Sequence, residues 1–363
     1  MSEALAPLSL AEIPGWDSDD HHAALLAFQR SAREILAQGH GFRRIAQFGG
    51  TREDWLDVCK KAERVANARQ FFKSEFLAFK VHDASRPQGL FTGYYEPETE
   101  GRLTPSPSYS VAIYKKPDDL VVFNEDERRA TGLSYGRREG GKPLPYFTRR
   151  EIEEGALKGR GLEICYVKSW VDAFFIHVQG SGRVQLPDGK SLRLSFAAKS
   201  GLPYTSIGAE LLARGFGTPE TMSMQFLRHW LSTHPGEARA LLWRNASFVF
   251  FRATGFGDEN LGAIGAAKVP LTPQRSLAVD RAFWAFGTPL LIDTHLPPEA
   301  KADAQPFRHL MIAQDTGSAI KGLVRGDIYW GWGAEAELIS GHMKSLGQMV
   351  ALLPKAVAER LPQ

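Results

Sequence analysis

Two aspartates in the last quarter of the chain, Asp315 and Asp327, stand twelve residues apart at the edges of apolar segments. Both segments are expected strands, with Asp315 ending the first and Asp327 beginning the second. A glycine-rich connector of this length can fold back and bring the two carboxyls together. Carboxyls that are withdrawn from water and repel each other have a raised pKa, which suits a general acid. The spacing therefore predicts an acid–base site.

Aromatic residues follow the second aspartate immediately. Tyr329, Trp330 and Trp332 lie within six residues of Asp327, and the flat faces of such rings stack on sugar rings. Trp330 and Trp332 are separated by one residue, so in a strand they point to the same face. That shared face is either a sugar-binding groove or part of the core, and the spacing fits both.

Three other motifs suggest a functional site, but each lacks a residue that the chemistry requires. The glycine-rich segment 136–142 resembles a phosphate-binding loop but continues into Pro143, where Ser or Thr is required. His21 and His22 have no third ligand at a useful spacing. The segment Asp315-Thr-Gly-Ser318 matches the aspartic-protease signature but occurs once, whereas a chain of this length needs two copies. We expect no metal and no cofactor.

The amino-acid composition argues against several classes of protein. The 363 residues are 43% hydrophobic and 23% charged, which indicates a globular protein of about two domains. Lys and Arg number 44 against 41 Asp and Glu, so the balance gives no indication of nucleic-acid binding. No apolar run is long enough to span a bilayer, and the N-terminus shows no secretory signal. Cys59 and Cys165 exclude a disulfide framework but leave one bridge open.

The periodicity predicts an α+β chain whose centre is a β-barrel or sandwich. The first eighty residues are expected to be helical, with caps at 17–20 and a second helix from Thr51 toward Phe72. Another helix is expected from Ser206 to Gly215, and a further one begins at Thr218 with Pro219 in its first turn. The expected strands are 110–114, 165–167, 172–178, the hairpin 183–186 with 191–194, 247–251, 288–293, 309–313 and 327–330.

Three segments together resemble the membrane-bound lytic transglycosylase A family, whose members cut bacterial peptidoglycan. They are Thr92-Gly-Tyr-Tyr-Glu-Pro97, the segment from Trp170 through Gln-Gly-Ser-Gly182, and Leu310–Gly322 continuing into Gly326-Asp-Ile-Tyr-Trp-Gly331. The resemblance implies a mainly β fold with flanking helices: a double-psi β-barrel from residues 1–112 and 249–363, and an inserted β domain from 113–248. A groove between the two would hold the glycan strand.

The same resemblance assigns roles to residues. Asp327 takes the place of the family's catalytic acid, and Asp315 that of the neighbouring aspartate. Asp293 completes the three-aspartate module. As a separate hypothesis on the mechanism, we expect Lys321 to act as a counter-ion to Asp315. The expected substrate contacts, including these last two, are Tyr94, Thr104, Gln179, Gly180, Ser181, Asp293, Lys321, Tyr329 and Trp330.

The implied reaction needs one acid, because the C6 hydroxyl of N-acetylmuramic acid attacks C1 in place of water. The implied partner is the peptidoglycan glycan strand, and we expect a monomer that binds no nucleic acid. A periplasmic or outer-membrane location is implied, although the family's lipid-anchor signal is not visible in this sequence.

Two rival functions remain open at the level of sequence. A hydrolytic glycosidase on the same barrel requires a second carboxylate, for which Asp315 and Glu96 are the candidates. A non-catalytic wall-binding protein would keep the groove and not need the acid, and the intact Asp327 motif counts against it.

Overall fold

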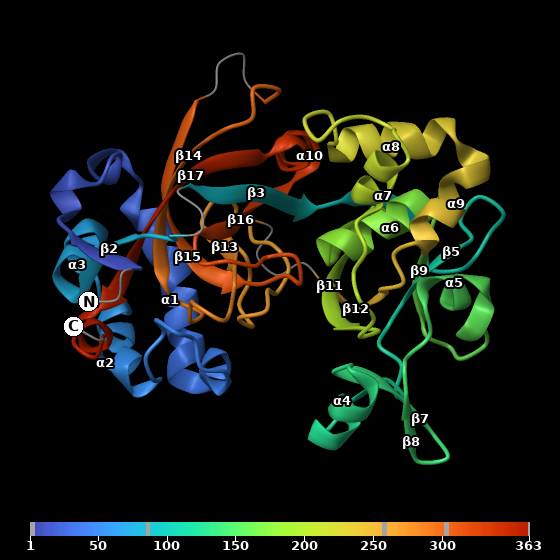
Figure 1. The fold of residues 1–363 in the computed structure, drawn as a ribbon, viewed down its shortest axis with the longest axis horizontal. Helices are drawn as coiled ribbons and strands as arrows, with labels where there is room; N and C mark the ends of the chain where they lie inside the picture. Colours follow the sequence, from blue (N-terminus) through green and yellow to red (C-terminus); the bar gives the residue numbers. More distant parts are fainter. Residues whose placement is uncertain (1–3, 85–87, 256–259, 301–304, 362–363) are drawn as a thin grey trace. The chain divides into compact units, whose positions relative to one another are not determined.

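The structure, a computed structural model, describes residues 4–84, 88–255, 260–300 and 305–361. The chain forms two compact units: unit 1 comprises Met1–Tyr95 with Asp258–Gln363, and unit 2 comprises Glu96–Gly257. The expected boundaries at 112 and 249 differ from these. Residues near both positions belong to unit 2 because strands Val111–Tyr114 and Val249–Thr254 hydrogen-bond within its sheet. Both units are mixtures of helix and sheet, and the fold is mostly β (Figure 1).

Unit 1 is built around one sheet with strand order β1-β2-β17-β14-β15-β13-β16-β3. Because β3 also pairs with β17, the strands from β17 to β3 form a closed ring. The ring is a barrel, while the double-psi crossover within it stays a prediction. The elements of unit 1 are β1 Leu5–Leu8, α1 His21–Ala37, α2 Glu53–Ala62, α3 Ala68–Glu75, β2 Phe76–Val81, β3 Gly89–Glu96, β13 Ser276–Val279, β14 Pro289–His295, β15 Pro306–Asp315, β16 Arg325–Trp332, α10 Gly333–His342, β17 Lys344–Pro354 and α11 Lys355–Ala358.

Strands from opposite ends of the chain complete this sheet. β2 lies beside β17 in antiparallel register, with Phe79 opposite Ala351 (Figure 1). Helix α1 packs on β15, where the buried Gln314 amide donates to the Ala27 carbonyl at 2.8 Å and to Ser31 Oγ at 2.9 Å. The register against β13 shifts here, with Ala313 opposite Leu277 and Asp315 opposite Ala278, so the strand is irregular at Gln314.

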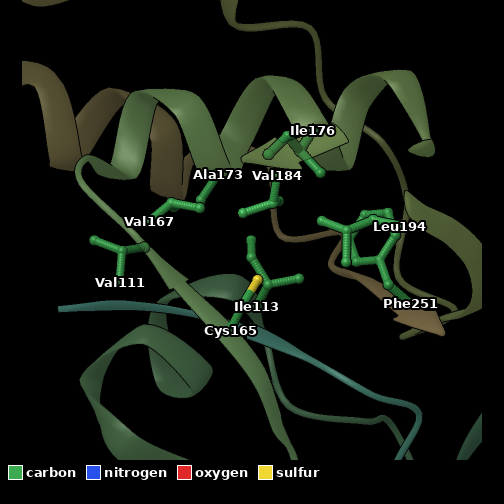
Figure 2. Packing of buried hydrophobic residues seen from close by; sticks show 9 residues of the cluster. All are labelled: Val111, Ile113, Cys165, Val167, Ala173, Ile176, Val184, Leu194 and Phe251. Carbon is green, nitrogen blue, oxygen red and sulfur yellow. The ribbon is translucent and has the colours of Figure 1, made fainter. Parts of the chain in front are cut away.

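Unit 2 holds a sheet with order β12-β11-β10-β4-β9-β5 and a small sheet β6-β7-β8. The core of the larger sheet packs β-branched and aromatic side chains against helix α6, as Figure 2 shows. Its elements are β4 Glu98–Arg102, β5 Val111–Tyr114, β6 Val121–Val122, α4 Glu125–Thr131, β7 Tyr135–Glu139, β8 Lys142–Leu144, α5 Arg149–Glu151, β9 Glu163–Val167, α6 Trp170–Gln179, β10 Ser181–Gln185, β11 Ser191–Lys199, α7 Ile207–Ala213, α8 Met224–Thr233, α9 Pro235–Trp243 and β12 Val249–Thr254.

Several expected elements are wrong. The expected strand 172–178 is helix α6, which begins at the Ser169 cap. The helix expected from Thr51 to Phe72 is two helices, because Asn67 caps a new start. The helix expected at Thr218 starts later, after the Ser223 cap, and residues 5–8 and 76–81 of the expected helical region are strands. The hairpin 183–186 with 191–194, the cap at Ser206 and the strands of the last quarter are confirmed.

The two cysteines are free and buried, which answers the open question of a single bridge. Within the described residues, no helix combines the length and the apolar character needed to cross a membrane.

Candidate active site

The two aspartates of the predicted acid–base site lie on either side of one short strand. β13 pairs with β15 in parallel and with β16 in antiparallel register, and Ala278 is the register partner of both Asp315 and Asp327. Neighbouring strands are about 4.8 Å apart, so the two Cα atoms are separated by roughly 10 Å. The side chain at the position between them is the methyl group of Ala278.

Asp315 is held by three donors. Its Oδ1 accepts from the backbone N–H of Ala266 at 3.0 Å and of Thr316 at 2.9 Å, and its Oδ2 accepts from the Tyr94 hydroxyl at 3.0 Å. Burial raises the pKa of Asp315, these three hydrogen bonds oppose the rise, and repulsion by Asp327 adds to it.

Asp327 has a different environment. Its Oδ1 accepts from the Thr92 hydroxyl at 2.5 Å, and Thr92 in turn accepts from the Arg325 guanidinium at 2.9 Å. Burial raises the pKa of Asp327, while the charge of Arg325 and the Thr92 hydrogen bond limit the rise. The side chain is half-buried, so a carboxyl with a raised pKa retains some exposure to solvent.

Strand β3 supplies the hydroxyl donors to both aspartates, because its side chains point alternately to its two faces. Thr92 and Tyr94 are two residues apart and point to the same face of the strand, where one contacts Asp327 and the other Asp315. Gly93 between them faces the other way, and a Cβ atom there would lie 2.7 Å from the Trp330 indole nitrogen. A larger residue at position 93 would therefore displace the strand that carries both hydroxyls.

Tyr94 remains a donor at all ordinary pH values. Burial raises the pKa of its hydroxyl well above the usual range, and the negative charges of Asp315 and Asp327 raise it further. Its ring also packs on Tyr329 at a centroid distance of 5.2 Å. Tyr94 is buried, so its position fits holding Asp315 better than contacting a sugar.

The aromatic residues predicted to bind sugar are buried. Tyr329 is fully enclosed in a core cluster with Tyr94, Leu271 and Ala278. Trp330 points to the face opposite Asp327 and packs on Phe307 at 5.2 Å. Of the two tryptophans that follow Asp327, the half-buried one is Trp332, which caps α10.

Asp293 and Lys321 lie apart from the acid pair. Asp293 is the register partner of Arg308 on β15 and accepts from its guanidinium at 2.9 Å. Arg308 lies seven positions before Asp315 on β15, a distance of roughly 23 Å along the strand. The Lys321 ammonium is 3.6 Å from Asp280 and serves that residue rather than Asp315.

The remaining predicted contacts belong to unit 2. Gln179 ends α6 and Gly180 caps it with φ 75°, and a Cβ atom at Gly180 would meet nothing within 4 Å. Ser181 begins β10 and is buried, so the segment is a helix-to-strand junction. Thr104 lies exposed in a bend after β4.

Glu96, the rival acid, is fully buried in unit 2. One of its oxygens lies 3.0 Å from Arg183 Nε and 3.4 Å from Arg193 Nε. A carboxylate enclosed by two guanidiniums is a structural ion pair and has no access to a water molecule that it could activate.

Sequence reasoning did not identify Thr92 and Arg325 as functional residues. The signal was present, because Thr92 stands two residues before Tyr94 and Arg325 two residues before Asp327, and period-2 spacing places such pairs on one face. The two backbone donors to Asp315 have no sequence signal, since any residue supplies an N–H.

Two half-buried carboxyls with raised pKa values beside donor hydroxyls form a candidate acid–base site. Comparison with known proteins then identifies the family. The model of the MltA specific insert domain matches residues 90–252, and that of the 3D domain matches residues 275–353. The chain belongs to the MltA family.

Individual relatives agree. Membrane-bound lytic murein transglycosylase A of Escherichia coli K12 is 38% identical over 265 residues, covering 72% of this chain and 65% of the relative, so the alignment spans slightly less than two thirds of that protein. The crystal structure of a membrane-bound lytic murein transglycosylase from Agrobacterium tumefaciens is 38% identical and covers 98% of this chain and 99% of the other, with a TM-score of 0.87. The structure of E. coli MltA with bound chitohexaose is 29% identical, covers 98% of this chain and 92% of the other, and has a TM-score of 0.69.

Proposed function

We propose that this protein is a peptidoglycan lytic transglycosylase. It would cleave the β-1,4 bond between N-acetylmuramic acid and N-acetylglucosamine without water and leave a 1,6-anhydro end. The observation that carries the proposal is the Asp315–Asp327 pair across Ala278, in which Asp327 is half-buried with a raised pKa. The relatives support it, because they are named lytic murein transglycosylases and one of them was solved with a chito-oligosaccharide.

Asp327 is the proposed acid and then the base. Its protonated carboxyl donates to the glycosidic oxygen as the C1–O bond breaks, and the C6 hydroxyl of the same muramic residue attacks C1. The resulting carboxylate takes the C6 hydroxyl proton, so the acid is regenerated and no water is consumed. An intramolecular nucleophile of this kind has an effective molarity of up to about 10⁵–10⁸ M when well oriented, which makes a second nucleophilic carboxylate unnecessary.

Asp315 is proposed to assist without transferring a proton. Three donors favour its ionised form, and a negative charge at this site makes ionisation of Asp327 less favourable. The donors also occupy both oxygens, which argues against the use of Asp315 to activate water in a hydrolase.

Unit 2 is proposed to contribute sugar contacts through Gln179 and Gly180. The open space at Gly180 lets a ligand approach the backbone closely. Thr104, which is exposed, is a further proposed contact, whereas the buried Ser181 is less suited to one. The proposed location is the periplasm or the outer membrane, in keeping with relatives named membrane-bound.

Mass spectrometry of muropeptides released from purified peptidoglycan tests the proposal. The expected products are lighter than ordinary reducing ends by one water and are absent with Asp327→Asn. Ordinary reducing ends would establish a hydrolase and overturn the proposal. Binding to the polymer without release, by a protein that is folded, would establish a wall-binding protein.

A further inference from the structure

Arg325, Thr92 and Asp327 form a continuous hydrogen-bonded chain across two neighbouring strands. The buried Arg325 guanidinium donates through Nη2 to Thr92 Oγ1 at 2.9 Å, and Thr92 Oγ1 donates to Asp327 Oδ1 at 2.5 Å. Through Nη1 the same guanidinium donates to the carbonyls of Leu90 on β3 and Gly326 on β16. Arg325 is thus fixed to both strands and has little freedom to move away from Thr92.

The donors and acceptors in this hydrogen-bonded chain can be assigned in only one way. A guanidinium has donors and no acceptor, so it must use a lone pair of the Thr92 oxygen. The one hydroxyl hydrogen of Thr92 is then directed to Asp327 Oδ1. If Oδ1 carried a proton, the Thr92 hydrogen would need another acceptor, and the described residues offer it none.

We propose that Arg325 and Thr92 are positioning residues that keep Asp327 Oδ1 as an acceptor, so that the transferable proton resides on Oδ2. This inference rests on the proposed role of Asp327 as the general acid. It assigns the proton to one oxygen and therefore one direction of delivery, because the two oxygens of a carboxyl face different parts of the site. An acid whose proton alternated between both oxygens would be oriented for transfer during part of the time only.

The arrangement also has an electrostatic consequence. The Arg325 charge and the Thr92 hydrogen bond both lower the pKa of Asp327 against the effect of burial. They keep the acid from becoming so weak that it donates poorly, since the best general acids have a pKa near the working pH.

The test compares two pairs of variants. Thr92→Val removes the hydroxyl at similar volume and Thr92→Ser restores it, while Arg325→Gln removes the charge and Arg325→Lys keeps it. We expect Thr92→Val to lower kcat about 10- to 100-fold with little change in KM, and Thr92→Ser to recover most of the rate. The alkaline limb of the kcat profile should move to higher pH in Thr92→Val and Arg325→Gln, because both lose a group that stabilises the carboxylate. It should move less in Arg325→Lys.

A second readout separates this inference from the proposed function. The carboxyl carbon of Asp327, followed by NMR in ¹³C-labelled protein, should titrate at higher pH in Thr92→Val and Arg325→Gln than in the parent, whatever reaction the protein catalyses. Arg129→Gln, which removes an exposed arginine paired with Glu125, is the matched control and should leave that titration unchanged. The positioning role would be overturned if Thr92→Val and Arg325→Gln both fold and leave the titration of Asp327 unchanged. It would also be overturned if Thr92→Ser were as slow as Thr92→Val. If the Asp327 titration shifts as expected but no anhydro products are released, the proposed transglycosylase function is overturned and the positioning role remains.

Discussion

Glu96 in unit 2 and the pair Asp315 and Asp327 in unit 1 are all acidic residues withdrawn from water, but their nearest hydrogen-bond partners differ. In unit 2 the Glu96 carboxylate lies between Arg183 and Arg193, at 3.0 and 3.4 Å from their Nε atoms. In unit 1 the donors nearest to Asp315 and Asp327 are hydroxyls and backbone N–H groups. A buried carboxylate between two guanidiniums is part of a structural ion-pair network, whereas the raised pKa values of Asp315 and Asp327 suit proton transfer.

The difference explains why residue type alone could not choose between the candidate acids. Glu96 and Asp327 are both polar residues in glycine- and aromatic-rich segments. What separates them is the partner that the fold provides, and for Glu96 these partners are arginines almost a hundred residues away in the sequence.

The largest expected effect comes from removing the carboxyl of Asp327. Asp327→Asn keeps the shape of the side chain and its contact with Thr92 but cannot donate and accept a proton in turn. We expect the rate of anhydro-muropeptide release to fall at least about 1,000-fold. Release at more than a tenth of the parent rate, measured by quantitative mass spectrometry, would remove Asp327 from the mechanism.

The corresponding change in unit 2 should affect stability instead of chemistry. Glu96→Gln leaves two buried guanidiniums without their carboxylate, which costs about 3–5 kcal/mol of unfolding free energy. Urea unfolding measures this cost.

Glu98→Gln is the matched control for Glu96→Gln. Glu98 is exposed two residues further on, in β4, and its replacement should change stability by less than about 0.5 kcal/mol. Equal stability of the two variants would show that the buried ion pairs of Glu96 do not contribute as described.

Asp315→Asn should have an intermediate effect. It removes the negative charge that repels the Asp327 carboxylate, so the pKa of Asp327 should fall and the alkaline limb of the activity profile should move to lower pH. We expect a loss of about 10- to 100-fold at neutral pH, measured as kcat between pH 4 and 9. A limb that moves upward would contradict the proposed repulsion.

The smallest expected effect is that of the Tyr94 hydroxyl. Tyr94→Phe removes one donor from Asp315, while the two backbone donors remain. A hydrogen bond to a charged group contributes about 1.5 kcal/mol, so kcat should fall no more than about tenfold. A loss as large as that of Asp327→Asn would mean that Tyr94 itself contacts the reacting atoms.

Stability should also depend on pH through Asp327. Its folded-state pKa lies above the unfolded value, so this group favours the folded state at pH below the unfolded pKa and loses that contribution as pH rises through the folded pKa. Asp327→Asn should therefore melt at a higher temperature than the parent at pH 7 and show a smaller advantage near pH 4. Calorimetry at the two pH values measures the difference.

Much of the barrel was predictable because its strands are continuous apolar runs that end at polar residues. The segments that became β14, β15 and β16 were expected on this basis. The segment 172–178 was wrongly predicted as a strand because it is short and apolar on nearly every side, which fits a buried helix equally well. Ser169 with Asp172 three residues later was the cap signal that would have corrected it.

The candidate site was predicted in part. A glycine-rich connector suggested that Asp315 and Asp327 meet, but the structure brings them together through β13, a strand some forty residues earlier in the chain. Pairing between distant segments has no local signal, and the same reason hid the contributions of Thr92 and Arg325. The aromatic residues after Asp327 were ambiguous between groove and core, and the alternation of β16 directs Trp330 away from the acid.

The closed ring of unit 1 has a consequence for the order in which its strands come together. β17, close to the end of the described chain, pairs with β2, β3 and β14, so β3 gains its second neighbour late in synthesis. Contacts between segments that are far apart in the sequence form slowly, because a long stretch of chain must first be brought together. A growing polypeptide would carry both aspartates before it carried the strand that secures Thr92 and Tyr94 beside them. The ring of strands in unit 1 is therefore completed only after residue 354 has been synthesised.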